Sequence, residues 1–119
     1  MWYAAHVIMR YRYADTSTDS LVGYENVFLV KADSPAAAIE RAREFGSDDE
    51  IRTEGSSLNG RRAHLIMIGV KKVVECLLTP GSPELLSDGD EITYNELVAK
   101  SESDFASFVR GEFAEIEIA

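Results

Sequence analysis

The sequence contains few of the residues that build disulfide or membrane frameworks. Cys76 is the single cysteine, so no disulfide can form within the chain, and we expect a reducing, cytoplasmic compartment. No apolar run approaches the ~18 residues of a membrane span, so we expect no transmembrane segment. The apolar residues from Met1 to Met9 lack a preceding basic segment and soon meet Arg10. They predict a strand and not a signal peptide.

Positive charge is also scarce. The chain has 12 Lys and Arg against 21 Asp and Glu, which gives a formal net charge of −9. Residues 84–119, the acidic C-terminal third, hold 10 acids and 2 bases. Binding to nucleic acid or to an anionic membrane requires the opposite balance, so we expect neither partner. The acidic C-terminal third predicts either a solvated face or a surface for a basic protein partner.

The hydrophobic pattern predicts one α+β domain over residues 1–119. Alternating or apolar segments predict strands at residues 2–13, 21–32, 61–77 and 91–99, with a last strand within 112–118. The order ββαββα-β then indicates an antiparallel sheet of four to five strands with two helices on one face.

Local signals predict where the two helices begin and end. Asp33 or Ser34, followed by Pro35, begins the first helix, and Gly46 is placed to end it, which leaves residues 47–60 as a polar loop. Ser101 and Asp104 resemble a capping box at the start of the second helix, which we expect to end at Gly111.

The first strand is apolar on both faces, which raises a packing problem. Val7, Met9 and Tyr11 lie on one parity, whereas Trp2 and Ile8 lie on the other. A strand that is apolar on both sides is normally buried on both sides. The sheet must therefore curl, or be covered by loops or by another chain, and we expect a homodimer through the sheet face.

Several short motifs follow one another in an order that resembles a known family. The motifs are Trp2 to Ala5, Tyr24 to Val27, Asn59 to Arg61, Gly69 to Lys72 and Gly89 to Tyr94. Together they resemble a family of short, single-domain bacterial proteins described only as a domain of unknown function. Leu58, Arg62 and the longer segment at residues 77–86 depart from the family pattern. The resemblance implies a bacterial cytoplasmic protein and no particular activity.

The sequence contains little that predicts catalysis. His6 and His64 are the only histidines, and they could meet if their strands are neighbours, as a metal-binding or acid–base pair. No third metal ligand is suitably spaced to the two histidines, and neither a second cysteine nor an adjacent histidine activates Cys76. We therefore predict no metal, no cofactor and no catalytic residue.

Three classes of function therefore stay open. The first is a protein-interaction module, such as an immunity-like inhibitor or an assembly subunit, that uses the acidic C-terminal third and an apolar sheet face. The second is a small-ligand-binding or sensory domain, and the third is an enzyme. The residues we predict for a ligand or partner surface are Trp2, His6, Tyr24, Glu25, Arg61, His64, Asp90 and Glu91.

Overall fold

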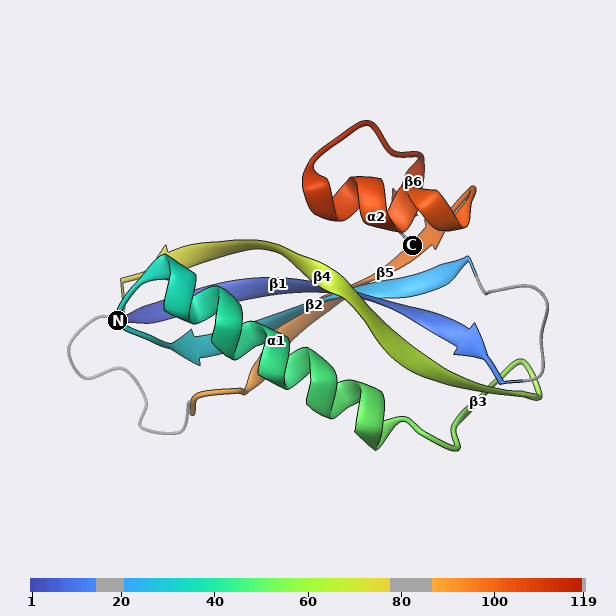
Figure 1. Cartoon of the computed structure of the whole chain (residues 1–119), viewed down its shortest axis with the longest axis horizontal. Helices are drawn as coiled ribbons and strands as arrows, with labels where there is room; N and C mark the ends of the chain where they lie inside the picture. Colours follow the sequence, from blue (N-terminus) through green and yellow to red (C-terminus); the bar gives the residue numbers. More distant parts are fainter. Residues whose placement is uncertain (15–20, 78–86, 119) are drawn as a thin grey trace.

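The computed structural model describes residues 1–14, 21–77 and 87–118. In these residues the strands form one antiparallel sheet with the order β3-β4-β1-β2-β5-β6 (Figure 1). Two helices, α1 and α2, complete the fold. In chain order the elements are β1 (Trp2–Tyr13), β2 (Val22–Lys31), α1 (Pro35–Arg52), β3 (Ser57–Leu58), β4 (Arg61–Cys76), β5 (Glu91–Ala99), α2 (Glu102–Arg110) and β6 (Ile116–Ile118).

The predicted α+β class and antiparallel sheet are confirmed. The strand that the sequence did not predict is β3, which pairs with the start of β4 across the tight turn at Asn59 and Gly60, both with positive φ. The last strand is shorter than predicted, and most of the predicted loop at residues 78–90 lies outside the described residues. Neither helix in the described parts of the chain is long and apolar enough to cross a bilayer.

The two helices pack against opposite faces of the sheet, which corrects the prediction that both lie on one face. Val7 and Met9 of β1 share a buried cluster with Ala38 and Ala42 of α1. Ile8, between them in the sequence, belongs to a second cluster with Phe105 of α2. Because successive strand residues point to opposite faces, β1 is buried under one helix on each side.

Helix α1 begins as predicted but continues beyond Gly46 to Arg52, so the prediction that residues 47–52 form a loop is wrong. The Ser34 side chain accepts a hydrogen bond from the Ala37 N–H at 3.1 Å, and Pro35 opens the first turn. Gly46 faces the sheet, where an added Cβ would lie 2.4 Å from Met67 Sδ. Glycine here allows close helix–sheet packing and does not end the helix.

Helix α2 follows the predicted boundaries. The capping box is present, with the Asp104 carboxylate accepting a hydrogen bond from the Ser101 N–H at 3.0 Å. Gly111 ends the helix in the left-handed region, at a φ of 73°. Phe105 is fully buried and anchors α2 to the sheet.

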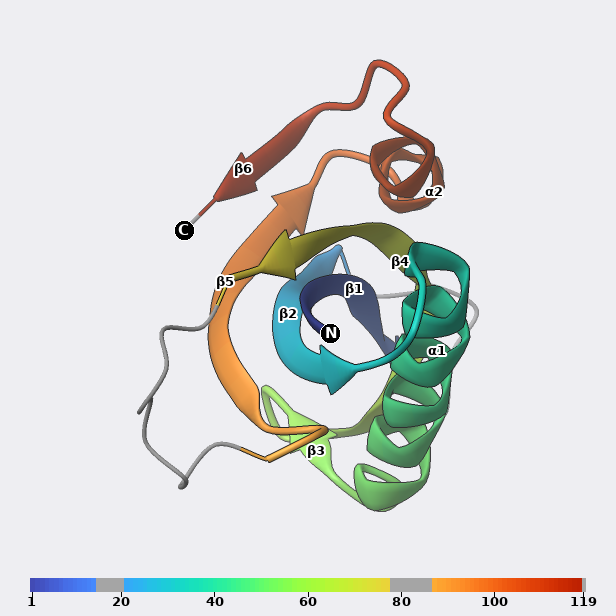
Figure 2. The same ribbon diagram turned by 90° about the vertical axis from the view of Figure 1, so that its left-hand side faces the viewer.

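The pairing of β1 with β4 contains two register shifts, one between His6 and Val7 and one between Ile8 and Met9. At each shift β4 carries one extra residue, Lys71 at the first and Ile68 at the second. Such bulges increase the local twist of a sheet, and Figure 2 shows the strands wrapped around the long axis of the molecule.

The second apolar face is buried within the single chain. Ile8, Val27 and Leu29 all lie on the side opposite α1 by strand alternation, and none is more than 4% exposed. The curl of the sheet, together with α2, therefore covers this part of the face without a second chain. The homodimer stays a prediction.

Candidate functional site

A shallow cavity of about 290 Å³, open to solvent, lies on the α1 face of the sheet, beside the C-terminal end of α1. Its walls come from four strands, β4, β1, β2 and β5, and from the end of α1. The lining residues are Tyr11, Tyr24, Asn26, Arg52, Thr53, Leu65, Glu91 and Tyr94. Small-molecule sites commonly measure roughly 300–1,000 Å³, so this cavity suits a small ligand.

Thr53 attaches the last turn of α1 to the sheet at this cavity. Its hydroxyl donates a hydrogen bond to the Asp49 carbonyl at 2.8 Å and accepts one from the Leu65 N–H at 3.0 Å. The helix end is thus bonded directly to β4, which fixes the position of Arg52 on the cavity wall. The unexpected extension of α1 beyond Gly46 is what brings these residues to the site.

Three tyrosines from three neighbouring strands form a continuous row along the cavity. Tyr24 makes edge-to-face contacts with Tyr11 and with Tyr94, and both pairs have ring centroids 5.8 Å apart. The antiparallel register explains the row, because Tyr94 pairs directly with Asn26 and so lies diagonally across from Tyr24. Burial, followed by the effect of Tyr11, raises the pKa of Tyr24 to about 12. Tyr24 therefore stays a neutral phenol.

Asn26 is the buried polar group of the site. It is 5% exposed and lies in the cavity wall. Its side-chain amide offers both a hydrogen-bond donor and an acceptor. The Asn26 amide is therefore positioned to bond to whatever occupies the cavity.

One cation and two carboxylates lie at or beside the cavity. Arg52 is paired with Asp49, with 2.5 Å between Nη2 and Oδ1, and Asp49 is buried. Glu91, at the start of β5, is the other charged lining residue. Burial and the nearby Asp49 raise the pKa of Glu91, and the Arg52 charge opposes this effect.

The family comparison covers this whole site. A family model described as a domain of unknown function, DUF4288, matches residues 2–94. The chain belongs to the DUF4288 family. This confirms the resemblance seen in the sequence motifs. No curated protein and no solved structure matches the chain.

All eight residues that line the cavity fall inside the DUF4288 match, whereas α2 and β6 fall outside it. The match thus ends within β5, at Tyr94. The cavity is a feature of the DUF4288 segment, and the acidic surface of α2 and β6 is additional to that segment.

Two of the predicted surface residues, Tyr24 and Glu91, meet in the cavity. Asp90 precedes Glu91 but bonds elsewhere: its carboxylate accepts a hydrogen bond from the Ser87 N–H at 2.8 Å, and its carbonyl accepts one from the Leu29 N–H. Asp90 therefore holds the entry of β5 in place and does not line the cavity.

His6 and Glu25 lie on the opposite face of the sheet from the cavity. His6 Nδ1 is 3.3 Å from Glu25 Oε2, and the Asn95 side chain donates to Glu25 Oε1 at 3.1 Å. The strands of His6 and His64 are neighbours, yet their register pairs His6 with Lys72 and His64 with Arg12. The two imidazoles therefore do not meet, and the conditional prediction of a histidine pair is wrong.

Trp2 and Arg61 lie away from the cavity. Trp2 packs under the Lys31 ammonium, 5.6 Å from the ring centroid. Arg61 stacks over Tyr13 at 3.8 Å. In the described parts of the chain, no group of three or more His, Cys, Asp or Glu side chains is arranged to hold a metal ion.

Six of the eight lining residues were not predicted as part of a site: Tyr11, Asn26, Arg52, Thr53, Leu65 and Tyr94. A partial signal exists, since Tyr24 and Asn26 share one parity of β2 and therefore one face of the sheet. Arg52 had no such signal, because its position depends on α1 continuing beyond Gly46.

Proposed function

We propose that the DUF4288 segment of this chain is a small-molecule-binding module whose ligand occupies the tyrosine-lined cavity. The observation that carries the proposal is Asn26, a 5% exposed residue whose side-chain amide lines the cavity beside the tyrosine row. Ligand sites commonly place aromatic side chains beside a few converging polar groups. Three aromatic rings and the amide match this composition.

A fragment screen by two-dimensional NMR tests the proposal. Neutral, cationic and anionic fragments of benzene size are added to isotope-labelled protein, and we expect at least some of them to shift the Asn26 side-chain amide signal and the Tyr94 ring signals. Tyr94→Ala should weaken the shift of the Asn26 signal, because it removes one wall of the cavity without touching the buried core; Tyr94 is 60% exposed.

Phe113→Ala is the matched control, because Phe113 is an aromatic residue outside the cavity that is 86% exposed. It should bind fragments as the unmodified protein does. A screen in which no fragment shifts the cavity signals would overturn the proposal, and so would equal losses in the two variants.

The second candidate function is a protein-interaction surface on the acidic C-terminal third, and one observation favours it. Both bases of this third are already neutralised, since Lys100 pairs with Glu115 at 3.1 Å and Arg110 pairs with Glu112 at 2.7 Å. The remaining carboxylates leave a surface suited to a basic protein partner.

Light scattering at low and high salt tests this second candidate. The chain is measured alone, which reports the predicted homodimer, and with a labelled oligolysine peptide. We expect peptide binding that weakens at high salt and that Glu117→Lys reduces, since screening and charge reversal both act on surface electrostatics. Binding that is indifferent to salt would reject the acidic surface as the docking site.

A further inference from the structure

The charge balance of the cavity indicates the chemistry of its ligand. Arg52 is the cation of the lining, and its guanidinium is already bonded to Asp49 at 2.5 Å. Once this pair is counted as neutral, Glu91 leaves one negative charge at the cavity. An anionic ligand would meet the Glu91 carboxylate, and Arg52 would attract it less because Asp49 already balances the Arg52 charge.

The tyrosine row also favours a positively charged ligand. Aromatic faces carry negative electrostatic potential and attract cations, by about 0.5–2 kcal/mol according to how dry the site is. The edge-to-face packing of Tyr24 with Tyr11 and Tyr94 sets neighbouring rings at 70° and 79°. Rings at such angles can surround a compact cation from more than one direction.

Asn26 adds a neutral acceptor deeper in the wall. Its amide oxygen can accept a hydrogen bond from an ammonium or guanidinium N–H. Carboxylate, amide oxygen and aromatic faces thus converge on one small volume.

We infer that the cavity binds an organic cation, an ammonium or guanidinium group carried on a small apolar body. This inference rests on the proposed function and narrows it to a ligand class. The cationic group lies beside Glu91, and the apolar body lies against the tyrosine row.

Three probes of equal size and different charge test the inference: benzylammonium, benzyl alcohol and benzoate. NMR titration of the Asn26 and Tyr94 signals gives a Kd for each. We expect benzylammonium to bind about threefold or more tightly than benzyl alcohol, the range that a cation–aromatic contact supplies, and benzoate to bind most weakly.

Glu91→Gln should remove the preference for benzylammonium over benzyl alcohol. Glu117→Gln is the matched control, because it removes the same charge from exposed β6, outside the cavity. It should retain the preference.

The failures of the two proposals are distinguishable. If benzyl alcohol or benzoate shifts the cavity signals as strongly as benzylammonium does, the cavity binds ligands but the cation inference is wrong. An equal loss of preference in Glu91→Gln and Glu117→Gln also overturns it, since the effect would then come from overall charge. If no probe and no fragment of the wider screen shifts these signals, the proposed function itself fails.

Discussion

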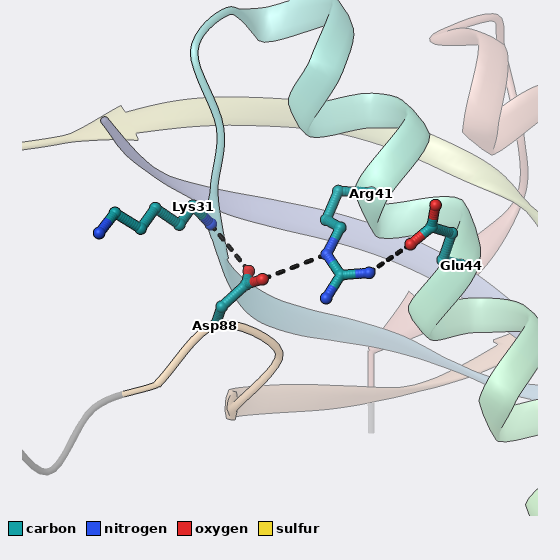
Figure 3. Close-up of polar contacts among 4 residues, drawn as sticks. All are labelled: Lys31, Arg41, Glu44 and Asp88. Atoms are coloured by element: carbon teal, nitrogen blue, oxygen red, sulfur yellow. Dashed lines mark hydrogen bonds and ion pairs between the residues drawn. The ribbon is translucent and has the colours of Figure 1, made fainter.

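Asp88 and Arg41 join the entry of β5 to helix α1. The Asp88 carboxylate accepts a hydrogen bond from Arg41 Nε at 3.1 Å and another from the Lys31 N–H at 2.9 Å (Figure 3). Arg41 is held from its other side by Glu44. One carboxylate thus ties together the end of β2, the middle of α1 and the segment that leads to Glu91.

Asp88→Ala should loosen the segment that positions Glu91. We expect a loss of about 0.5–1 kcal/mol in the free energy of unfolding, because Asp88 is partly exposed and its ion pair is screened by solvent. We also expect weaker binding at the cavity, although Asp88 does not line it. Urea unfolding and probe titration measure the two effects. Glu40→Ala is the control, since it breaks the exposed pair with Arg43 on α1 and should leave binding unchanged.

Phe105→Ala should destabilise the protein by about 3–5 kcal/mol, as is usual when a fully buried aromatic side chain is removed. The ring joins α2 to Ile8 and Leu97, so α2 should unfold first. Hydrogen exchange followed by NMR would show α2 amides that lose protection before those of α1. Phe113→Ala should change stability by less than about 0.5 kcal/mol. Comparable losses in the two variants would contradict the assignment of Phe105 to the core.

Gly23→Ala should be strongly destabilising. A Cβ at this position would lie 2.3 Å from the Met9 carbonyl oxygen and 2.9 Å from the Phe105 ring. Backbone cannot yield as a flexible side chain can, so we expect a loss of about 2 kcal/mol or more in thermal or urea unfolding. Gly111→Ala is the comparison: an added Cβ there meets nothing within 4 Å, and the variant should lose only about 1 kcal/mol from its positive φ.

The stability of the fold should depend on Glu91 in a pH-dependent way. Burial raises the pKa of Glu91, Asp49 adds to the rise, and Arg52 opposes it. A carboxyl whose pKa is raised by folding stabilises the fold below its ordinary value of 4.5, and this contribution is lost as the pH rises through the raised pKa. Glutamine does not ionise, so Glu91→Gln should be more stable than the unmodified protein at neutral pH.

Urea unfolding at several pH values measures this effect. The advantage of Glu91→Gln should shrink as the pH falls through the raised pKa of Glu91, and it should be lost below 4.5, where Glu91 is protonated in both states. Benzylammonium binding to the unmodified protein should weaken over the same range, because the carboxylate is lost. An advantage that persists unchanged at low pH would mean that the substitution acts through packing and not through charge.

Local signals predicted most of the fold. The bounds of β5 are those predicted, and Ser34, Ser101 and Gly111 act at helix ends as expected. These features depend on residues close together in the sequence, and their chemistry is the same in any fold. Gly46 was misread as a helix end because its role depends on close packing against Met67 of β4, which is distant in sequence.

The site was harder to predict than the fold. Tyr11, Tyr24 and Tyr94 become one row only through the strand order and register, and no local signal specifies either. The prediction that His6 and His64 could meet failed for the same reason, since two neighbouring strands can be paired in many registers. Tyr24 and Glu91 were found because aromatic and charged residues at strand positions are noticeable in the sequence itself.

The paired bulges in β4 have a consequence for the way this strand tolerates insertions and deletions. Each extra residue reverses which side chains of β4 face α1, and the second reversal cancels the first, so Leu65 and Val73 both pack into the α1 cluster. Loss of Ile68 alone would exchange the inward and outward side chains along one whole end of the strand. Loss of Ile68 and Lys71 together would restore the original pattern. Length changes in this strand should therefore be accepted two at a time, and single-residue steps should be rejected.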